Sequence, residues 1–382
     1  MKSILLLVLF FCSFFVIAKP VSASENPLAV ANNKIGIHIL TESELPEAAK
    51  LVNSNGGNWG YVLIPIQSGD RDLIKWQRFM NTCKKNHVIP IIRLATEGDY
   101  FNTKVWRTPN DNDIVNFANF LDALDWPTKN RYIIVFNEVN RADEWGGKAD
   151  PAQYAQILSF AVSVFKSINP DFFMIGAGMD NAAPDQGNIY INQYNYFTQM
   201  NQAVPGIFNQ LDGMSSHSYP NPGFSQKPNT TSTMGVGSFI HERELMKKLS
   251  NKELPVFITE TGWSSEVVPE DTRVQYYDET FKTIWNDKGI VAITPFLLQA
   301  GTGPFEKFTY ITASGYKTKQ YRFLYDLPKV KGVPSFPTRI LAAETSRFKD
   351  QQTKDFTKYR PKVRSISLRK IMVNIFNHLI GA

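Results

Sequence analysis

Two glutamates stand where apolar segments of the sequence end, and both could act as acids, bases or nucleophiles. Glu138 follows the apolar run Ile133–Phe136, and Glu260 follows the run Val256–Thr259. An unpaired charge beside apolar residues is costly, so each carboxylate needs solvent, a partner or a task. A pair of carboxylates at the mouth of a fold suits hydrolysis of a glycosidic bond. Either glutamate alone could equally cap a strand or pair with a basic neighbour.

Other polar side chains lie close to the ends of further apolar runs. His217 and Tyr219 are two residues apart, so they face the same side of an extended chain. Arg93 and His38 lie near the ends of two earlier runs. A structural histidine is the alternative for His217, and an ordinary salt bridge in the core is the alternative for Arg93.

The elements that must position these residues are short apolar runs separated by helical patterns. Many runs are continuously apolar, as expected for strands covered on both faces. Eight strands alternating with helices predict an α/β protein with a closed (β/α)8 barrel, as a single catalytic domain over residues 30–330. A doubly wound open sheet is the alternative, although the glycine-rich turn typical after its first strand is missing. The runs are Lys34–Leu40, Trp59–Ile66, Val88–Ala95, Arg131–Asn137, Phe172–Ala177, Leu211–His217, Pro255–Glu260 and Ile290–Leu298.

Helix start signals stand between these runs. Thr41 to Glu44 has the spacing of a capping box, and Asp150-Pro151 places a capping residue before a proline at the first helical position. Because active sites of such barrels lie at the carboxyl ends of the strands, Glu138 and Glu260 would share one mouth. Further helices are predicted over 72–85, 112–126, 188–204, 238–249 and 269–287.

Phe136-Asn137-Glu138 and Ile258-Thr259-Glu260, at the ends of the fourth and seventh expected strands, resemble motifs of a known clan. This is the large clan of retaining glycoside hydrolases built on (β/α)8 barrels, which includes cellulases, β-mannanases, β-xylosidases and β-galactosidases. The resemblance implies that Glu138 is the acid/base and Glu260 the nucleophile, while Asn137 binds the sugar 2-hydroxyl.

The same resemblance implies roles for neighbouring residues. Clan members often carry a histidine and a tyrosine where this sequence has His217 and Tyr219, with the tyrosine hydroxyl bonding the nucleophile. Arg93 would hold the nucleophile ionised, and His38 would line the sugar site.

Aromatic residues supply the remaining candidates for sugar binding. Trp145 and Trp263 follow the two glutamates and would stack on sugar faces, with core packing as the alternative for Trp263. Many clan members carry a tryptophan at the end of strand eight, whereas this sequence offers only Phe296 there. The string Glu260 to Trp263 also resembles the plant-type endo-β-1,3-glucanases of the same clan, so the substrate stays open.

The excess of basic over acidic residues lies outside the expected barrel. The net charge is +6 and the pI about 9, yet residues 1–23 carry +2 and residues 338–382 carry +7, which leaves −3 for residues 24–337. We therefore expect no nucleic-acid partner. The five histidines show no HExxH spacing, and no phosphate-binding loop occurs, so we expect neither metal nor cofactor.

The two ends of the chain carry separate signals. Lys2, the 15-residue apolar run from Ile4 to Ala18, and Ala23 preceded by Val21 predict a signal peptide over residues 1–23. The run is shorter than the ~20 residues needed to span a bilayer, and a retained anchor is the alternative. We expect a secreted or cell-envelope protein, in which Cys83 is left without a disulfide partner.

Residues 338–382 form a basic tail. Five Lys and Arg residues between 354 and 364 precede apolar residues that recur at helical spacing from Leu368 to Leu379. The pattern predicts an amphipathic helix, which contacts a membrane surface or an acidic polymer through residues 354–382 or folds back on the barrel.

These features favour an exported, monomeric retaining glycosidase that cleaves β-linked bonds of a poly- or oligosaccharide by a two-glutamate double displacement. Carbohydrate is its expected partner. A barrel without catalysis that binds polysaccharide in the cell envelope is one alternative, and a tethered structural or adhesion factor is another.

Overall fold

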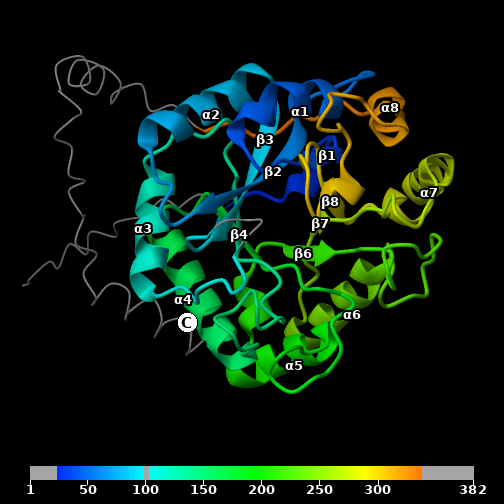
Figure 1. The fold of residues 1–382 in the computed structure, drawn as a ribbon. Coiled ribbons are helices and arrows are strands. Elements are labelled where there is room, and N and C mark those ends of the chain that lie inside the picture. Colours follow the sequence, from blue (N-terminus) through cyan, green and yellow to red (C-terminus); the bar gives the residue numbers. More distant parts are fainter. Residues whose placement is uncertain (1–23, 99–102, 338–382) are drawn as a thin grey trace, which may run out of the picture.

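Parallel strands form the centre of the molecule, and helices surround them (Figure 1). The computed structural model describes residues 24–98 and 103–337. Strands β1 to β5 form one hydrogen-bonded sheet and β6 to β8 another. Parallel bridges from Ile175 to Gly213 and from Ile35 to Ile293 join the two sheets at both seams, which closes the barrel. The strands are β1 Gly36–His38, β2 Gly60–Gln67, β3 Val88–Ala95, β4 Arg131–Val135, β5 Phe172–Gly176, β6 Met214–His217, β7 Val256–Glu260 and β8 Ile290–Ile293.

The helices follow the strands in alternation, as the sequence predicts, and several begin at the expected caps. The side chain of Asp72 accepts hydrogen bonds at the start of α2, Asp150 caps α4, and Thr41 with Glu44 forms the capping box. The helices are α1 Leu45–Val52, α2 Leu73–Lys85, α3 Asp111–Asp122, α4 Pro151–Ile168, α5 Gln193–Ala203, α6 Ser238–Ser250, α7 Glu270–Lys282 and α8 Lys319–Asp326, with short 3-10 helices at Pro27–Ala29, Glu42–Glu44, Ile207–Gln210, Ile284–Asn286 and Glu306–Phe308.

Alternate residues of the strands build two separate apolar layers. Tyr61 and Leu63 of β2 belong to a cluster with residues of β3, β4, β5, β7 and β8 that fills the barrel. Val62 and Ile64, which alternate with them, belong to the larger cluster packed between strands and helices. This two-sided burial explains why the strand runs read as continuously apolar.

The structure corrects the bounds of several expected elements and adds one helix. Strand β8 ends at Ile293 instead of Leu298, because the Thr294 hydroxyl bonds the carbonyl of Thr259 and Pro295 has no N–H to donate. Helix α8 was not expected from the sequence, and α3 ends at Asp122 rather than 126.

The predicted signal peptide and the predicted tail helix lie outside the described residues. Within the described part of the chain, no helix combines the length and apolar character that crossing a membrane requires. Cys83 is buried in the core, and burial raises the pKa of its thiol.

Candidate active site

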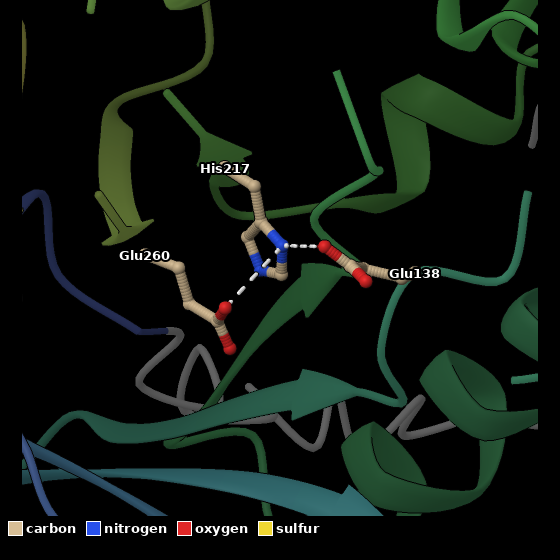
Figure 2. Close-up of side chains that lie close together, drawn as sticks. All are labelled: Glu138, His217 and Glu260. Carbon is tan, nitrogen blue, oxygen red and sulfur yellow. Dashed lines mark hydrogen bonds and ion pairs between the residues drawn. The ribbon is translucent and has the colours of Figure 1, made fainter. Parts of the chain in front are cut away.

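Three side chains from the ends of different strands meet at one point, as Figure 2 shows. Glu260 is the last residue of β7, His217 is the last residue of β6, and Glu138 follows β4. The His217 ring stands between the two carboxylates, with Nδ1 2.9 Å from Oε1 of Glu138 and 3.9 Å from Oε2 of Glu260. One ligand atom from each residue lies within 4.8 Å of the others. The sequence prediction that the two glutamates share one mouth is therefore confirmed.

An unusual backbone turn positions Glu138 at the end of β4. Phe136 and Glu138 have positive φ angles of 71° and 38°, which residues other than glycine rarely adopt. Such conformations cost on the order of 1–3 kcal/mol each and persist only where the surroundings fix them. Here the Glu138 N–H donates to the Gly178 carbonyl at 2.9 Å, and the Arg141 N–H donates to the Glu138 carbonyl at 2.9 Å.

Room for the His217 ring depends on a glycine after β5. A Cβ atom on Gly178 would lie 2.3 Å from Cδ2 and 2.5 Å from Nε2 of His217, and real Cβ contacts are not that short. The absence of a side chain at residue 178 is therefore a condition for the position of His217 beside Glu138.

Glu260 is held from several sides. Arg93 Nη1 donates to its Oε1 and also to Oδ1 of Asn137, the latter at 2.8 Å. The Tyr219 hydroxyl donates to Oε2 at 3.0 Å. These contacts are the ones that the clan resemblance implies for Arg93 and Tyr219.

The charges around Glu260 keep it ionised. Burial alone would raise its pKa, but the charges of His217, Arg93 and His38 outweigh burial and lower the pKa to about 2. Burial lowers the pKa of His38 to about 3, so His38 is neutral near pH 7. The permanent positive charge beside Glu260 at neutral pH is therefore that of Arg93.

Glu138 has a different set of partners. His217 contacts its Oε1, and Arg141 Nη1 donates to its Oε2 at 3.2 Å. Burial lowers the pKa of His217, but the charge of Glu260 and the hydrogen bond to Glu138 raise it more, and the net shift is upward. The ring is therefore a cation more often than an exposed histidine would be.

Sequence reasoning missed the acidic and basic side chains around Glu138. Arg141 also holds Asp143 at 2.7 Å and reaches Asp180 at 3.5 Å. Burial and the neighbouring charge of Glu138 raise the pKa of Glu144 to about 7. The available signal was that Arg141 and Glu144 follow Glu138 within one short polar loop.

His38 is buried beside Glu260, and Phe296 is buried against His38. His38 has no exposed surface, its Nδ1 is 3.8 Å from Oε1 of Glu260, and neither ring nitrogen has a hydrogen-bond partner among the described residues. Phe296 packs edge-on against His38, with ring centroids 4.9 Å apart. The expectation that His38 lines the sugar site is wrong, because its ring has no exposed surface that a sugar could touch. Phe296 keeps a small exposed area.

The two tryptophans lie elsewhere. Trp145 is buried against Phe136 and Tyr154, and Trp263 is buried among aromatic residues of α7 and the following turn. Neither exposes a face on which a sugar could stack, so packing is the interpretation that fits both. Of the other predicted residues, Arg93, His217 and Tyr219 each contact Glu138 or Glu260, and Asn137 contacts Arg93.

The geometry can also be compared with metal binding. Glu138, His217 and Glu260 form the group of ligand-type side chains within the described residues whose spacing could hold a cation. The guanidinium of Arg93 already occupies Oε1 of Glu260 and repels a further positive charge. The arrangement fits an acid, a base and a nucleophile better than a metal centre.

Comparisons with known proteins show which solved structures have a similar fold. No protein-family model matches the chain, and no curated protein matches it in sequence. A family 39 glycoside hydrolase from the gut symbiont Bacteroides cellulosilyticus WH2 has a TM-score of 0.56 at 16% identity, covering 81% of this chain and 66% of that one. A GH5_18 protein from Streptomyces cattleya, in complex with GlcNAc, has a TM-score of 0.56 at 13% identity, covering 78% and 80%.

An exo-β-1,4-mannosidase from Opitutaceae bacterium strain TAV5 is a third similar structure. Its TM-score is 0.52 at 12% identity, and the match covers 81% of this chain but 61% of the mannosidase. At these identities the likeness concerns the fold. This chain has the (β/α)8 fold that those glycoside hydrolases share.

Proposed function

We propose that the protein is a retaining glycoside hydrolase that cleaves β-linked O-glycosidic bonds of a poly- or oligosaccharide. The observation that carries the proposal is the spacing of its two carboxylates, which approach within 4.8 Å of one another. Retaining enzymes hold their carboxyl groups about 5–5.5 Å apart, whereas inverting enzymes leave about 6.5–9.5 Å for a water molecule. The short spacing supports direct attack by one glutamate.

In the first step Glu260 attacks the anomeric carbon, and the bond from that carbon to the leaving oxygen breaks. The ionised state of Glu260, maintained by Arg93 and Tyr219, supplies the electron pair. Glu138 gives its proton to the leaving oxygen, so the departing sugar leaves as an alcohol. Asn137, held by Arg93, is placed to bond a hydroxyl of the sugar.

In the second step water releases the sugar from Glu260. Glu138, now a carboxylate, takes a proton from water as the water oxygen attacks the anomeric carbon, which restores both carboxyl groups. The two donors at Glu138, His217 and Arg141, stabilise this carboxylate form. His217 also contacts both glutamates, so its charge changes the electrostatic environment of both steps.

We further propose that the protein acts as an exported monomer, secreted or held at the cell envelope. The signal-peptide pattern over residues 1–23 supports export.

Turnover assays on β-glucans, mannans and xylans test the proposal, with the product anomer followed by NMR. We expect the wild-type protein to release the β-anomer first, and E260Q to lose activity by a factor of roughly 10⁴ or more. E138A should still form the glycosyl-enzyme from aryl glycosides whose leaving group needs no proton. The exposed glutamate Glu266 provides the matched control, and E266Q should be unaffected.

Full hydrolysis by E260Q, or release of the inverted anomer, would contradict the mechanism. Binding of a polysaccharide by the wild-type protein without any turnover would favour the non-catalytic alternative.

A further inference from the structure

An arginine is held against the carboxylate of Glu138 by a second carboxylate. Arg141 follows Glu138 by three residues, and its backbone N–H donates to the Glu138 carbonyl at 2.9 Å. Asp143 accepts a hydrogen bond from Nε of Arg141 at 3.1 Å and another from Nη2 at 2.7 Å, which is the bidentate geometry that guanidinium and carboxylate groups favour. The remaining nitrogen, Nη1, donates to Oε2 of Glu138 at 3.2 Å. Asp143 therefore directs Nη1 of Arg141 toward Glu138.

A third carboxylate approaches Arg141 from the segment after β5. Oδ2 of Asp180 lies 3.5 Å from Nη1 of Arg141. The Asp180 N–H donates to Oδ1 of Asn140 at 3.0 Å, and Nδ2 of Asn140 donates to the Asp180 carbonyl at 3.0 Å. Asn140 has no exposed surface, so these two bonds are shielded from water. The buried amide of Asn140 therefore fixes Asp180 beside Arg141.

Charges of both signs surround Glu138. A positive neighbour favours its carboxylate form, and a negative neighbour favours its protonated form. Burial and the charge of Glu138 raise the pKa of Asp180, and they raise the pKa of Glu144 to about 7, so these acids and Glu138 disfavour each other's ionisation. Arg141 opposes this effect. The charged groups are Arg141, Asp143 and Glu144 from the loop of Glu138 itself, Asp180 after β5, His217 of β6, Glu260 of β7 and, through Asn137, Arg93 of β3.

The contacts of Arg141 differ from those of His217, the other donor to Glu138. His217 lies 2.9 Å from Glu138 and 3.9 Å from the nucleophile, so its charge acts on both carboxylates. Within the described part of the chain, the polar contacts of the Arg141 side chain are with Glu138, Asp143 and Asp180. A change at Arg141 should therefore alter the protonation of Glu138 more than that of the nucleophile.

Building on the proposed function, in which Glu138 is the acid/base, we propose that Arg141 is a positioning residue for Glu138. Its charge sets the pH above which Glu138 no longer holds the proton that the leaving oxygen needs, and its bonds to Asp143 fix the direction from which it contacts the carboxylate. The proton is needed where the leaving oxygen departs reluctantly, as the hydroxyl oxygen of a sugar does. Arg141 therefore acts on cleavage of bonds between sugars, and much less on the attack by Glu260.

Opposite charge changes in this ion pair test the role of Arg141. Phenyl β-glucoside, β-mannoside and β-xyloside need a proton on the leaving oxygen, whereas their 2,4-dinitrophenyl counterparts do not. With the phenyl glycosides we expect R141M to move the basic limb of the pH profile of kcat/KM upward by about one pH unit, because a positive charge beside Glu138 is lost. D143N should move that limb downward, because a negative charge is lost. With the 2,4-dinitrophenyl glycosides neither variant should move it.

Arg107 provides the matched control in the loop after β3. It pairs with Glu97 and, at 2.7 Å, with Asp113, so R107M removes an arginine with two acidic partners at the same end of the barrel. R107M should leave the basic limb in place. R141K retains the charge without the bidentate geometry, so its basic limb should return toward the wild-type pH while kcat/KM stays several-fold lower.

Thermal unfolding reports whether each variant folds, and D143N tests the sign of the effect even if R141M does not fold. A basic limb that stays in place in R141M and D143N, or that moves in the same direction in both, would overturn the role of Arg141. If the wild-type protein cleaves none of the aryl glycosides, the proposed function is wrong, and the role of Arg141 is wrong with it.

Discussion

Arg93 is the permanently charged side chain that donates a hydrogen bond to Glu260 and helps to keep it ionised. It donates to the carboxylate from inside the barrel, and burial by itself would raise the pKa of Glu260. We expect R93M to move the acidic limb of the pH profile of kcat/KM to higher pH, since more of Glu260 is then protonated. The loss at the optimum should be roughly 100-fold, as for removal of one preorganised donor.

R131M is the control for this change, because Arg131 pairs with Asp122 at 2.8 Å at the opposite end of β4. It removes an arginine ion pair without touching the site. An acidic limb that stays in place in R93M would show that Arg93 does not set the ionisation of Glu260.

The candidate residues could be predicted where they stood at strand ends, and less well where they stood in loops. Glu260 and His217 terminate strands, and the fold itself brings such positions to one mouth. Trp145 and Trp263 follow those ends by several residues, and no periodicity tells in which direction a loop side chain points. Arg141 was missed for the same reason, although it lies three residues after Glu138.

Strand β5 contributes to the site through a missing side chain. Gly178 lies two residues beyond β5, and a Cβ there would overlap the His217 ring. We expect G178A to displace His217 from Glu138 and to lower kcat/KM by roughly 10–100-fold, because small misplacements of catalytic groups are costly. Circular dichroism should show the fold retained.

G176A is a matched control on the same strand. A Cβ at Gly176 would meet Leu211 at 3.5 Å, which is an ordinary contact. Equal activity of G178A and G176A would show that the His217–Glu138 contact contributes little.

The packing of α6 on β6 contains a buried carboxyl group. Ser216 donates to Oε1 of Glu242 at 2.8 Å, and burial raises the Glu242 pKa from 4.5 to about 7. Between these values the folded state holds a proton that the unfolded state has lost. The free energy of unfolding should therefore fall as pH rises from 4.5 to 7, by at most about 1.4 kcal/mol for each pH unit.

Urea unfolding of E242Q at pH 5, 7 and 8 checks this pH dependence. The variant should lose this part of the slope and be more stable than the wild type at pH 8, where the native carboxyl is charged and buried. The exposed neighbour Glu244 provides the control, and E244Q should keep the wild-type slope. A wild-type slope in E242Q would refute the assignment to this residue.

The elements differ in how much of them the sequence could predict. Strand β3 coincides with its apolar run, because both its faces are buried. The run after Ile290 continues through Leu298, yet the strand stops at Ile293, and Phe296 and Leu297 beyond it pack in a separate cluster with Tyr219 instead. Helix α8 escaped detection because it has only eight residues, KQYRFLYD, and four of them are charged or amide side chains.

At the scale of the whole molecule, residues 24–337 and the tail 338–382 carry net charges of opposite sign. Residues 24–337 sum to −3 and the tail to +7, so a pI of about 9 describes the chain but not the barrel. The closed fold follows from the alternation of runs and helices, which the sequence displays from the first strand to the eighth. The placement of both ends of the described chain, Ser24 and Ser335, beside the amino ends of strands does not, because it depends on hydrogen bonds between segments as distant as Lys129 and Ser335.

The acidic excess at the catalytic end should determine which glycans the enzyme accepts. Thirteen acidic and eight basic residues in the described loops after the strands create a negative field around Glu138 and Glu260. We expect neutral β-linked oligosaccharides to be hydrolysed with a kcat/KM at least tenfold above that of analogues carrying a uronic acid. The difference should be largest near 0.01 M salt, where the Debye length is about 30 Å, and should shrink near 0.15 M, where it is about 8 Å.

Reversing the charge of acidic residues that lie away from Glu138 and Glu260 distinguishes long-range electrostatic repulsion from direct contacts with the sugar. Asp185 and Glu266 lie in loops at the catalytic end, and neither bonds a residue of the site. D185K/E266K should leave turnover of the neutral substrate unchanged. At low salt it should reduce the difference in kcat/KM between the neutral and the uronic-acid substrate, because the long-range repulsion is reduced. If the difference in kcat/KM changes neither with salt nor with charge reversal, close contacts in the sugar site, and not the electrostatic field of the barrel, exclude the anionic glycan.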